Sequence, residues 1–182
     1  MNRIRQARVD DAAAIVAIYN QGIEERQATF ETEPRSVGDI VGRIRDGERH
    51  PLLVACNDDG DVVGWAGVAP YRSRACYDGV GEFSVYLDRK ARSNGIGRAL
   101  MEALIGATRM RGYWKLVSRI FPANRASRAL CQSCGFREVG TYRSHARLDG
   151  RFEDVVIVER LIPENLTEAE APTRTVTAIE ES

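Results

Sequence analysis

The segment with the clearest chemical signal is a glycine-containing stretch that leads into an apolar, helix-forming run. It reads ARSNGIGRALMEAL and places Arg92 ahead of Gly95 and Gly97. Backbone N–H groups at a helix start have no partner within the helix, and the helix dipole adds partial positive charge there. Glycines lack a Cβ atom, so a phosphate can approach those donors closely, and an arginine adds charge-assisted hydrogen bonds. The pattern predicts a phosphate-binding loop.

Two common phosphate-binding motifs do not fit this chain. The pattern GxxxxGK[ST] is absent, and no GxGxxG follows a strand with an acidic residue at the required distance. The loop is therefore neither a Walker loop nor a dinucleotide site. The alternative is a glycine-containing turn that only starts a helix.

One carboxylate stands just before the apolar run FSVYL, which leads into this loop. A carboxylate at the position of Glu82 can accept a proton from an ammonium group, directly or through water, and so act as a general base. The alternative is a solvated glutamate at a strand edge. We favour the general base because the residues around Glu82 also have the types that a binding site needs.

Those residues form the segment APYRSRACYDG, in which two arginines lie between two tyrosines. The planar guanidinium groups of Arg72 and Arg74 suit carboxylates and other oxo-acids, and Tyr71 and Tyr77 can wall a small pocket. The alternative is a solvated basic loop. Phe30, isolated in a polar stretch, fits a substrate pocket and a core plug equally well.

Charge and composition exclude several classes of protein. The 182 residues suit one domain, and 26 Lys and Arg balance 26 Asp and Glu, which gives no net attraction to nucleic acid or acidic membranes. No apolar run is long enough to span a bilayer, and the first residues lack a signal-peptide core. We expect a cytoplasmic protein that binds neither nucleic acid nor membrane.

The cysteines and histidines do not form a recognisable metal site. Cys131 and Cys134 form a lone CxxC, and the two histidines lack zinc spacing. A redox site is one interpretation of this pair, and two thiols packed near the core is the favoured one. We expect no metal.

Hydrophobic periodicity and turn residues predict a mixed α/β domain over residues 1–162. Strands are expected at Ile4 and at 51–56, 62–69, 81–87, 113–121, 136–142 and 152–162. Helices are expected from Asp10 or Asp11 to Tyr19, from Ser36 to Ile44, over 97–111, and from Asn124 to Gly135. An Arg-rich loop separates the last two strands, and residues 163–182 are polar, which predicts a flexible tail.

The order of these motifs resembles the GCN5-related N-acetyltransferase (GNAT) family. The resemblance rests on R-x-x-G-x-G after a strand, an amphipathic helix, another strand, and a helix that opens at N-R-A-S before C-G-F. It covers residues 3–162 and implies a central, mostly antiparallel sheet of about seven strands flanked by helices. It also implies that the glycine loop holds the pyrophosphate of acetyl-coenzyme A (acetyl-CoA) as acetyl donor.

The resemblance assigns cofactor and catalytic roles to particular positions. Glu82 is implied as the general base. The implied acetyl-CoA contacts are Val85, Tyr86, Leu87, Arg92, Ser93, Asn94, Gly95, Ile96, Gly97, Arg98, Asn124 and Ser127. Cys131 stands where many relatives have a tyrosine or histidine that protonates the thiolate. A thiol can donate a proton, but a small buried side chain is the favoured interpretation, with water as the proton source.

Within the family, the segment APYRSRACYDGVGEFSVYL resembles the phosphinothricin acetyltransferase branch, and residues 118–162 resemble its arsenic-resistance subgroup. This resemblance implies a homodimer that acetylates the α-amine of a glutamate-like toxin, arsinothricin ahead of phosphinothricin or methionine sulfoximine. The implied substrate contacts are Phe30, Tyr71, Arg72, Arg74, Tyr77 and Glu82. The alternatives are a peptide or protein N-terminal acetyltransferase and a non-catalytic acetyl-CoA sensor.

Overall fold

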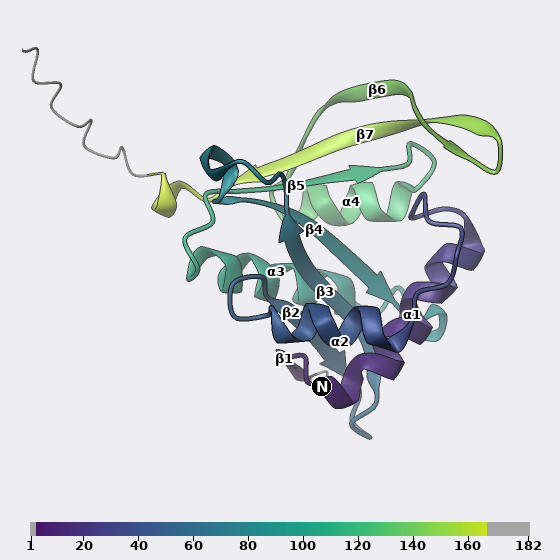
Figure 1. Cartoon of the computed structure of the whole chain (residues 1–182), viewed down its shortest axis with the longest axis vertical. Helices are drawn as coiled ribbons and strands as arrows, with labels where there is room; N and C mark the ends of the chain where they lie inside the picture. The colour runs from purple at the N-terminus through teal and green to yellow at the C-terminus, as the bar shows by residue number, and fades with distance from the viewer. Residues whose placement is uncertain (1–2, 167–182) are drawn as a thin grey trace, which may run out of the picture.

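The centre of the molecule is a seven-stranded mixed sheet with the order β1-β2-β3-β4-β5-β7-β6 (Figure 1). The computed structural model describes residues 3–166. All neighbouring strands are antiparallel except β4 and β5. The predicted fold class is therefore confirmed. The strands are β1 (Arg3–Gln6), β2 (Leu52–Cys56), β3 (Val62–Pro70), β4 (Val80–Leu87), β5 (Lys115–Ile120), β6 (Arg137–Leu148) and β7 (Arg151–Leu161).

Four helices cover the two faces of the sheet. Helices α1 (Ala12–Glu25) and α2 (Val37–Arg45) lie in front of it in Figure 1, and α3 (Ile96–Arg109) and α4 (Arg125–Ser133) lie behind it. Four short 3-10 helices complete the fold: η1 (Val9–Asp11), η2 (Ala75–Tyr77), η3 (Arg89–Ala91) and η4 (Pro163–Asn165). The Ser36 cap of α2 is confirmed, because the Ser36 hydroxyl accepts from the Asp39 N–H while the Asp39 carboxylate accepts from the Ser36 N–H.

Side chains alternate between two cores along the central strands, as the period of two in a strand requires. Phe83 and Val85 of β4 pack with the residues of α3 and α4, whereas Tyr86 packs with the residues of α1 and α2. Glu82 and Ser84 share the parity of Tyr86, so they too face the α1 and α2 side. One strand therefore presents apolar residues to one face and a row of polar and aromatic residues to the other.

Strands β4 and β5 pair only at their beginnings. The parallel register joins Val80, Gly81 and Glu82 to residues 115–117, and beyond Glu82 the two strands have no further ladder partners in each other. Both strands continue past this point, β4 to Leu87 and β5 to Ile120. An opening therefore forms between them, and Glu82 stands where it begins.

Two elements are longer than the sequence predicts. Helix α1 continues to Glu25 instead of ending near Tyr19, because Ile23 is buried and Gly22 lies so close to the Tyr86 ring that a Cβ atom would be 2.7 Å from it. Strand β6 runs on to Leu148 and takes up most of the predicted Arg-rich loop. An irregular register near Ser144, whose φ is 47°, lets β6 stay paired with β7 across a polar segment.

The end of the described chain stays packed beyond residue 162. The Asn165 side chain donates to the carbonyl oxygens of Arg109 and Tyr113, at 2.7 and 2.8 Å. Most of the predicted tail, residues 167–182, lies outside the described residues. Across residues 3–166, no helix is both long and apolar enough to cross a membrane.

Candidate active site

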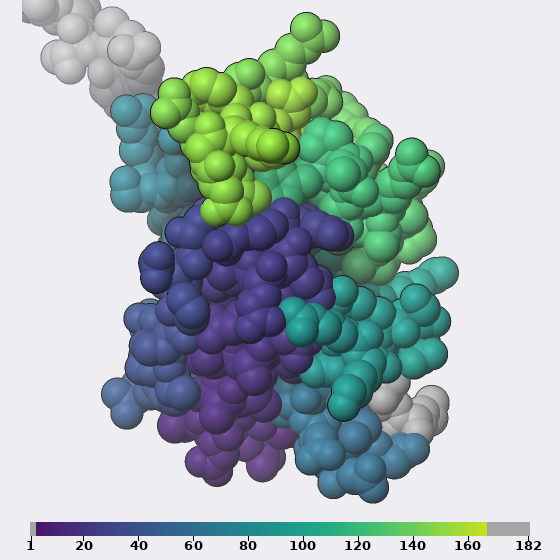
Figure 2. Space-filling model, turned by 90° about the vertical axis from the view of Figure 1, so that its right-hand side faces the viewer, coloured from purple at the N-terminus to yellow at the C-terminus, as the bar shows by residue number. Residues whose placement is uncertain are grey.

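A cavity of about 480 Å³ occupies the opening between β4 and β5. Residues from both faces of the sheet line it, so the cavity connects the α3 and α4 side with the α1 and α2 side. Figure 2 shows that the loop after α1 (purple), the glycine loop (teal) and the segment around α4 (green) meet on one face of the molecule. The lining comprises Tyr19, residues 28–31, 82–86 and 118–121, Met101, Asn124, Ser127, Leu130, Cys131 and Val155.

Glu82, the predicted base, is a lining residue of this cavity and is half-buried. Its carboxylate accepts from Arg119 Nε at 3.0 Å, and Nη2 of the same guanidinium contacts the same oxygen. Arg119 is more exposed than Glu82, so it closes the carboxylate off from the solvent side. The pair places a carboxyl group and a guanidinium next to each other, where an ammonium and a carboxylate of one small molecule can bind.

Aromatic rings form the wall of the cavity on the α1 and α2 side. Tyr86 stacks on Trp65 with ring centroids 4.9 Å apart and meets Tyr19 edge-on at 4.8 Å. Burial raises the pKa of both tyrosines, which are neutral near pH 7. The Tyr86 hydroxyl donates to the Ala28 carbonyl and ties the α1–α2 loop to the sheet.

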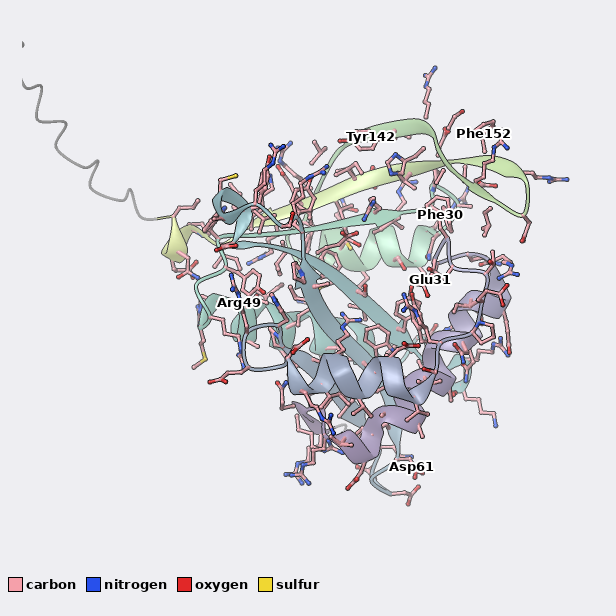
Figure 3. The ribbon with its side chains drawn as sticks, viewed as in Figure 1. Phe30, Glu31, Arg49, Asp61, Tyr142 and Phe152 are labelled. Atoms are coloured by element: carbon pink, nitrogen blue, oxygen red, sulfur yellow. The ribbon has the colours of Figure 1, made fainter. Side chains whose placement is uncertain are left out.

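Phe30 lies between a small core and the cavity. It meets Phe121 edge-on at 4.7 Å and packs on the small core of Phe121, Leu148 and Val155, yet it also lines the cavity. Figure 3 shows Phe30 on the β7 side of the α1–α2 loop and Glu31 closer to the helices. The loop therefore folds over the cavity and is anchored there by an aromatic contact.

The glycine loop ends in an uncapped helix start. Gly95 precedes α3 in the left-handed region (φ 76°), with no side chain capping the helix and nothing within 4 Å of an added Cβ atom. The first backbone hydrogen bond of the helix runs from the Ala99 N–H to the Gly95 carbonyl oxygen. Within residues 3–166, the N–H groups of Ile96, Gly97 and Arg98 therefore lack acceptors. Such donors form a site for an anion.

Gly97 fixes the position of this helix start beside the cavity. A Cβ atom there would lie 3.3 Å from Leu130, which lines the cavity, and 3.4 Å from Leu87. Such distances are tighter than usual contacts, so glycine allows α3 to approach the end of β4 closely. The uncapped N–H groups therefore lie next to the opening.

The charged residues predicted for this loop make other contacts in this structure. Arg92 pairs with Glu25 at 3.0 Å and donates to the Leu87 carbonyl at 3.4 Å. Arg98 pairs with Glu102 one turn along the helix. Ser93 and Asn94 are exposed, and Ser93 adopts a positive φ of 67°. In this structure Nη2 of Arg92 is therefore held at Glu25 and at the end of β4.

On the far side of the opening, Asn124 starts α4 and lines the cavity together with Ser127. The Asn124 Oδ1 accepts from the Ser127 N–H at 3.0 Å, and Nδ2 donates to the Gln27 carbonyl at 3.2 Å. Val85 lines the cavity from the opposite strand. The structure thus brings Glu82, Val85, Tyr86, Asn124, Ser127 and Phe30 to one cavity, with the glycine loop at its edge.

The predicted arginine pair lies elsewhere in this chain. Tyr71, Arg72, Arg74 and Tyr77 line a separate, shallow hollow in the loop between β3 and β4. The Arg72 guanidinium lies over the Tyr71 ring at 5.1 Å, and both arginines are exposed. Their role in binding stays a prediction, because the hollow shares no lining residue with the cavity at Glu82.

Cys131 is buried at the wall of the cavity, with 3% of its surface exposed. Burial raises the pKa of its thiol to about 12. Cys134 is also buried, and both cysteines carry free thiols. Among residues 3–166, no cluster of three or more His, Cys, Asp or Glu side chains is arranged to hold a metal ion.

Sequence reasoning missed Arg119, Trp65, Tyr19 and Arg43. These residues reach the site through strand register and helix packing. Arg119 meets Glu82 only because β5 runs parallel to β4 and then diverges from it. The alternation of Glu82, Ser84 and Tyr86 along one strand indicates that they share a face. No pattern in the sequence indicates which residues of other elements contact them.

Comparisons with known proteins identify the family. The sequence profile of the acetyltransferase (GNAT) family matches residues 15–136. An L-methionine sulfoximine/L-methionine sulfone acetyltransferase of Pseudomonas aeruginosa is 31% identical, with 86% of this chain and 92% of that protein covered.

Two solved structures are also similar to this chain. A GNAT superfamily phosphinothricin acetyltransferase from Sinorhizobium meliloti, in complex with acetyl-CoA, has a TM-score of 0.85 at 30% identity and covers 97% of this chain and 95% of its own. A ribosomal-protein-alanine N-acetyltransferase from Brucella melitensis has a TM-score of 0.84 at 33% identity over 88% and 99%. The chain belongs to the GNAT family of acetyltransferases.

Proposed function

We propose that this protein transfers the acetyl group of acetyl-CoA to the α-amine of a glutamate-like amino acid toxin. The relatives from Pseudomonas and Sinorhizobium support this substrate class by their names. One observation carries the proposal: Glu82 stands where β4 and β5 separate, between an uncapped helix start on one side and an aromatic-walled hollow on the other.

The residues at the opening fit acetyl-CoA. The free N–H groups of Ile96, Gly97 and Arg98 suit a pyrophosphate, and Gly95 leaves open space in front of them. Beyond Glu82, β4 has no ladder partner in β5, so main-chain groups of Val85 and Leu87 are placed to pair with an extended pantetheine arm. When bound, acetyl-CoA supplies a thioester, whose carbonyl carbon accepts the amine.

Direct transfer then needs only residues already in the cavity. The amine nitrogen attacks the carbonyl carbon, so a C–N bond forms while the C–S bond breaks. The nitrogen loses two protons between the ammonium group and the amide. Glu82 takes the first, which frees the amine for attack, and the second passes through water to the departing thiolate. Arg119 binds the α-carboxylate of the amino acid, which shares a carbon with the amine that Glu82 receives.

We expect Cys131 to have no part in proton transfer. Its buried thiol has a pKa of about 12, so it is a much weaker acid than an ordinary thiol and does not readily protonate the departing thiolate. Cys131→Ala is expected to keep kcat within about threefold of the wild-type value, whereas losing a general acid lowers a rate by roughly 10²- to 10⁴-fold. Steady-state thiol release measures the difference, and a large loss of kcat in a folded variant would restore the thiol as donor.

Among glutamate-like toxins we place arsinothricin first, ahead of phosphinothricin and methionine sulfoximine, on the resemblance of residues 118–162 to the arsenic-resistance subgroup. As an alternative to the arginines that line the cavity, binding of an anionic group of the substrate by Arg72 and Arg74 stays a prediction. Each is replaced by alanine, and the Michaelis constant for the amino acid is measured. A constant that stays at the wild-type value in both variants assigns these arginines to a solvated loop.

A second candidate is N-terminal acetylation of a peptide or protein, which the Brucella relative favours by its name. A thiol-release assay separates the two. Wild-type protein with acetyl-CoA is given arsinothricin, phosphinothricin, methionine sulfoximine, glutamate or a peptide that begins with alanine. We expect rapid release with the toxins and little with glutamate or the peptide. Release with the peptide alone favours the second candidate, and binding of acetyl-CoA without release across the panel favours a sensor.

We also propose a homodimer. Strand β7 is internal, between β5 and β6, so its apolar run serves the core and not an interface. Three of the exposed apolar residues, Val139, Tyr142 and Phe152, lie on the β6–β7 hairpin, where Figure 3 labels Tyr142 and Phe152. Light scattering coupled to size exclusion is expected to give twice the chain mass of 20.2 kDa, and a mass equal to one chain would contradict this proposal.

A further inference from the structure

A second hollow, of about 240 Å³, adjoins the cavity on the α1 and α2 side of the sheet. Tyr19, Glu31, Glu82 and Ser84 line both spaces, so the two are continuous at Glu82. The hollow is closed by Trp65 and by residues of α2, among them Arg43. A molecule whose amine lies at Glu82 can therefore extend into it.

Arg43 is the unusual residue of this hollow. Its guanidinium carbon lies 5.3 Å from the centre of the Trp65 ring, and one guanidinium nitrogen is 3.0 Å from the position of a Cβ atom on Gly67. Burial lowers the pKa of Arg43 from its ordinary value, although arginine stays charged at neutral pH. The cation is thus held against the sheet by an aromatic ring.

No carboxylate of residues 3–166 pairs with this cation. The acidic residues that line the hollow have other partners: Glu31 pairs with Arg35, Glu82 pairs with Arg119, and Asp39 accepts from Ser36. The buried indole N–H of Trp65 also lacks an acceptor. The Arg43 guanidinium and the Trp65 N–H are therefore two neighbouring donors without an acceptor. Burying an unpaired guanidinium costs folding free energy, and a bound anion would offset that cost.

The pairing register of β3 and β4 indicates how far Arg43 lies from Glu82 along the sheet. Gly67, against which the guanidinium lies, pairs with Ser84, whereas Glu82 pairs with Ala69. Two steps along a strand amount to about 7 Å. The α-carboxylate of an amino acid branches from the carbon that carries the amine and fits Arg119, beside Glu82. A group near Arg43 has to come from the far end of the side chain.

We propose that Arg43 binds the anionic oxo-acid group at the far end of the substrate side chain. This inference rests on the proposed function and refines it: among glutamate analogues with a tetrahedral end group, the enzyme prefers those whose end group is a charged oxo-acid over those with a neutral end. The guanidinium fork donates two hydrogen bonds to the oxo-acid oxygens, and the ring of Trp65 keeps the fork in place.

The test compares two substrates that differ in the charge at this end. Phosphinothricin ends in an anionic phosphinate, and methionine sulfone ends in a neutral sulfone. In Arg43→Gln, kcat/KM for phosphinothricin is expected to fall by roughly 20-fold more than kcat/KM for methionine sulfone. Arg43→Lys keeps the charge without the fork and is expected to lie between Gln and wild type. Arg45→Gln, an exposed arginine on the same helix, is the matched control.

Equal losses of kcat/KM for both substrates would overturn the proposal. They would mean that Arg43 binds a group that both substrates share, or that it only stabilises the fold. Calorimetric binding of phosphinothricin and of methionine sulfone to wild type and Arg43→Gln repeats the comparison without turnover. If wild type acetylates neither of these compounds nor arsinothricin, the proposed function fails on its own, and the binding comparison still decides the role of Arg43. An unchanged affinity for phosphinothricin in the variant would then contradict it.

Discussion

Glu82→Gln is expected to lower kcat/KM for the amino acid by roughly 10²- to 10⁴-fold, the usual contribution of a positioned general base. The affinity for acetyl-CoA is expected to stay within about twofold, because the uncapped start of α3 does not involve this side chain. Thiol release under steady-state conditions gives the rate, and equilibrium titration gives the affinity. Glutamine keeps the size of the side chain and a hydrogen-bond acceptor for Arg119, so the change removes mainly the capacity to take a proton.

Two further measurements separate a base from a residue that only holds Arg119. In Glu82→Gln the rate is expected to rise steeply with pH, because solvent then supplies the free amine that the carboxylate no longer generates. Glu138→Gln breaks a comparable pair, Arg128–Glu138 at 2.7 Å, on another element and is the matched control. A variant that keeps wild-type turnover at neutral and lower pH would remove Glu82 from the role of base.

The sequence predicts most elements of this fold because their signals are local. Ser36 and Asp39 form a capping box within four residues, Asn124 caps α4, and Gly112 and Gly135 have positive φ after their helices. Where a signal depends on distant packing, the prediction fails. The extension of α1 to Glu25 rests on Tyr86, far along the chain, and the extension of β6 rests on its pairing with β7.

The same distinction holds for the candidate site. The glycine loop and Glu82 lie in one continuous segment, so their spacing carries information about the site they form. Arg119, Arg43 and Trp65 come from β5, α2 and β3, and only the sheet register and the packing of α2 bring them near Glu82. Arg72 and Arg74 show the reverse: they are close to Glu82 in the sequence, yet they line a different hollow.

Gly95→Asp is expected to weaken acetyl-CoA binding by roughly 100-fold relative to Gly95→Asn. A carboxylate about 6 Å from a phosphate charge costs about 2–3 kcal/mol at an effective dielectric constant of about 20. Asparagine is the matched control, because it is nearly isosteric and, like aspartate, tolerates the left-handed conformation that Gly95 adopts at φ 76°. An added Cβ atom meets nothing within 4 Å, so neither variant is crowded at this atom. Isothermal titration of each variant with acetyl-CoA measures the difference.

Without coenzyme, the stability of the two variants is expected to follow the opposite order. An aspartate before the first turn of α3 faces the positive end of the helix dipole, so Gly95→Asp without coenzyme is expected to melt at the same temperature as Gly95→Asn or higher. Lower affinity combined with undiminished stability indicates repulsion of a bound anion, because damage to the fold would lower both. Equal affinities in the two variants would mean that the phosphates lie away from this helix start, and the loop would then serve only to begin α3.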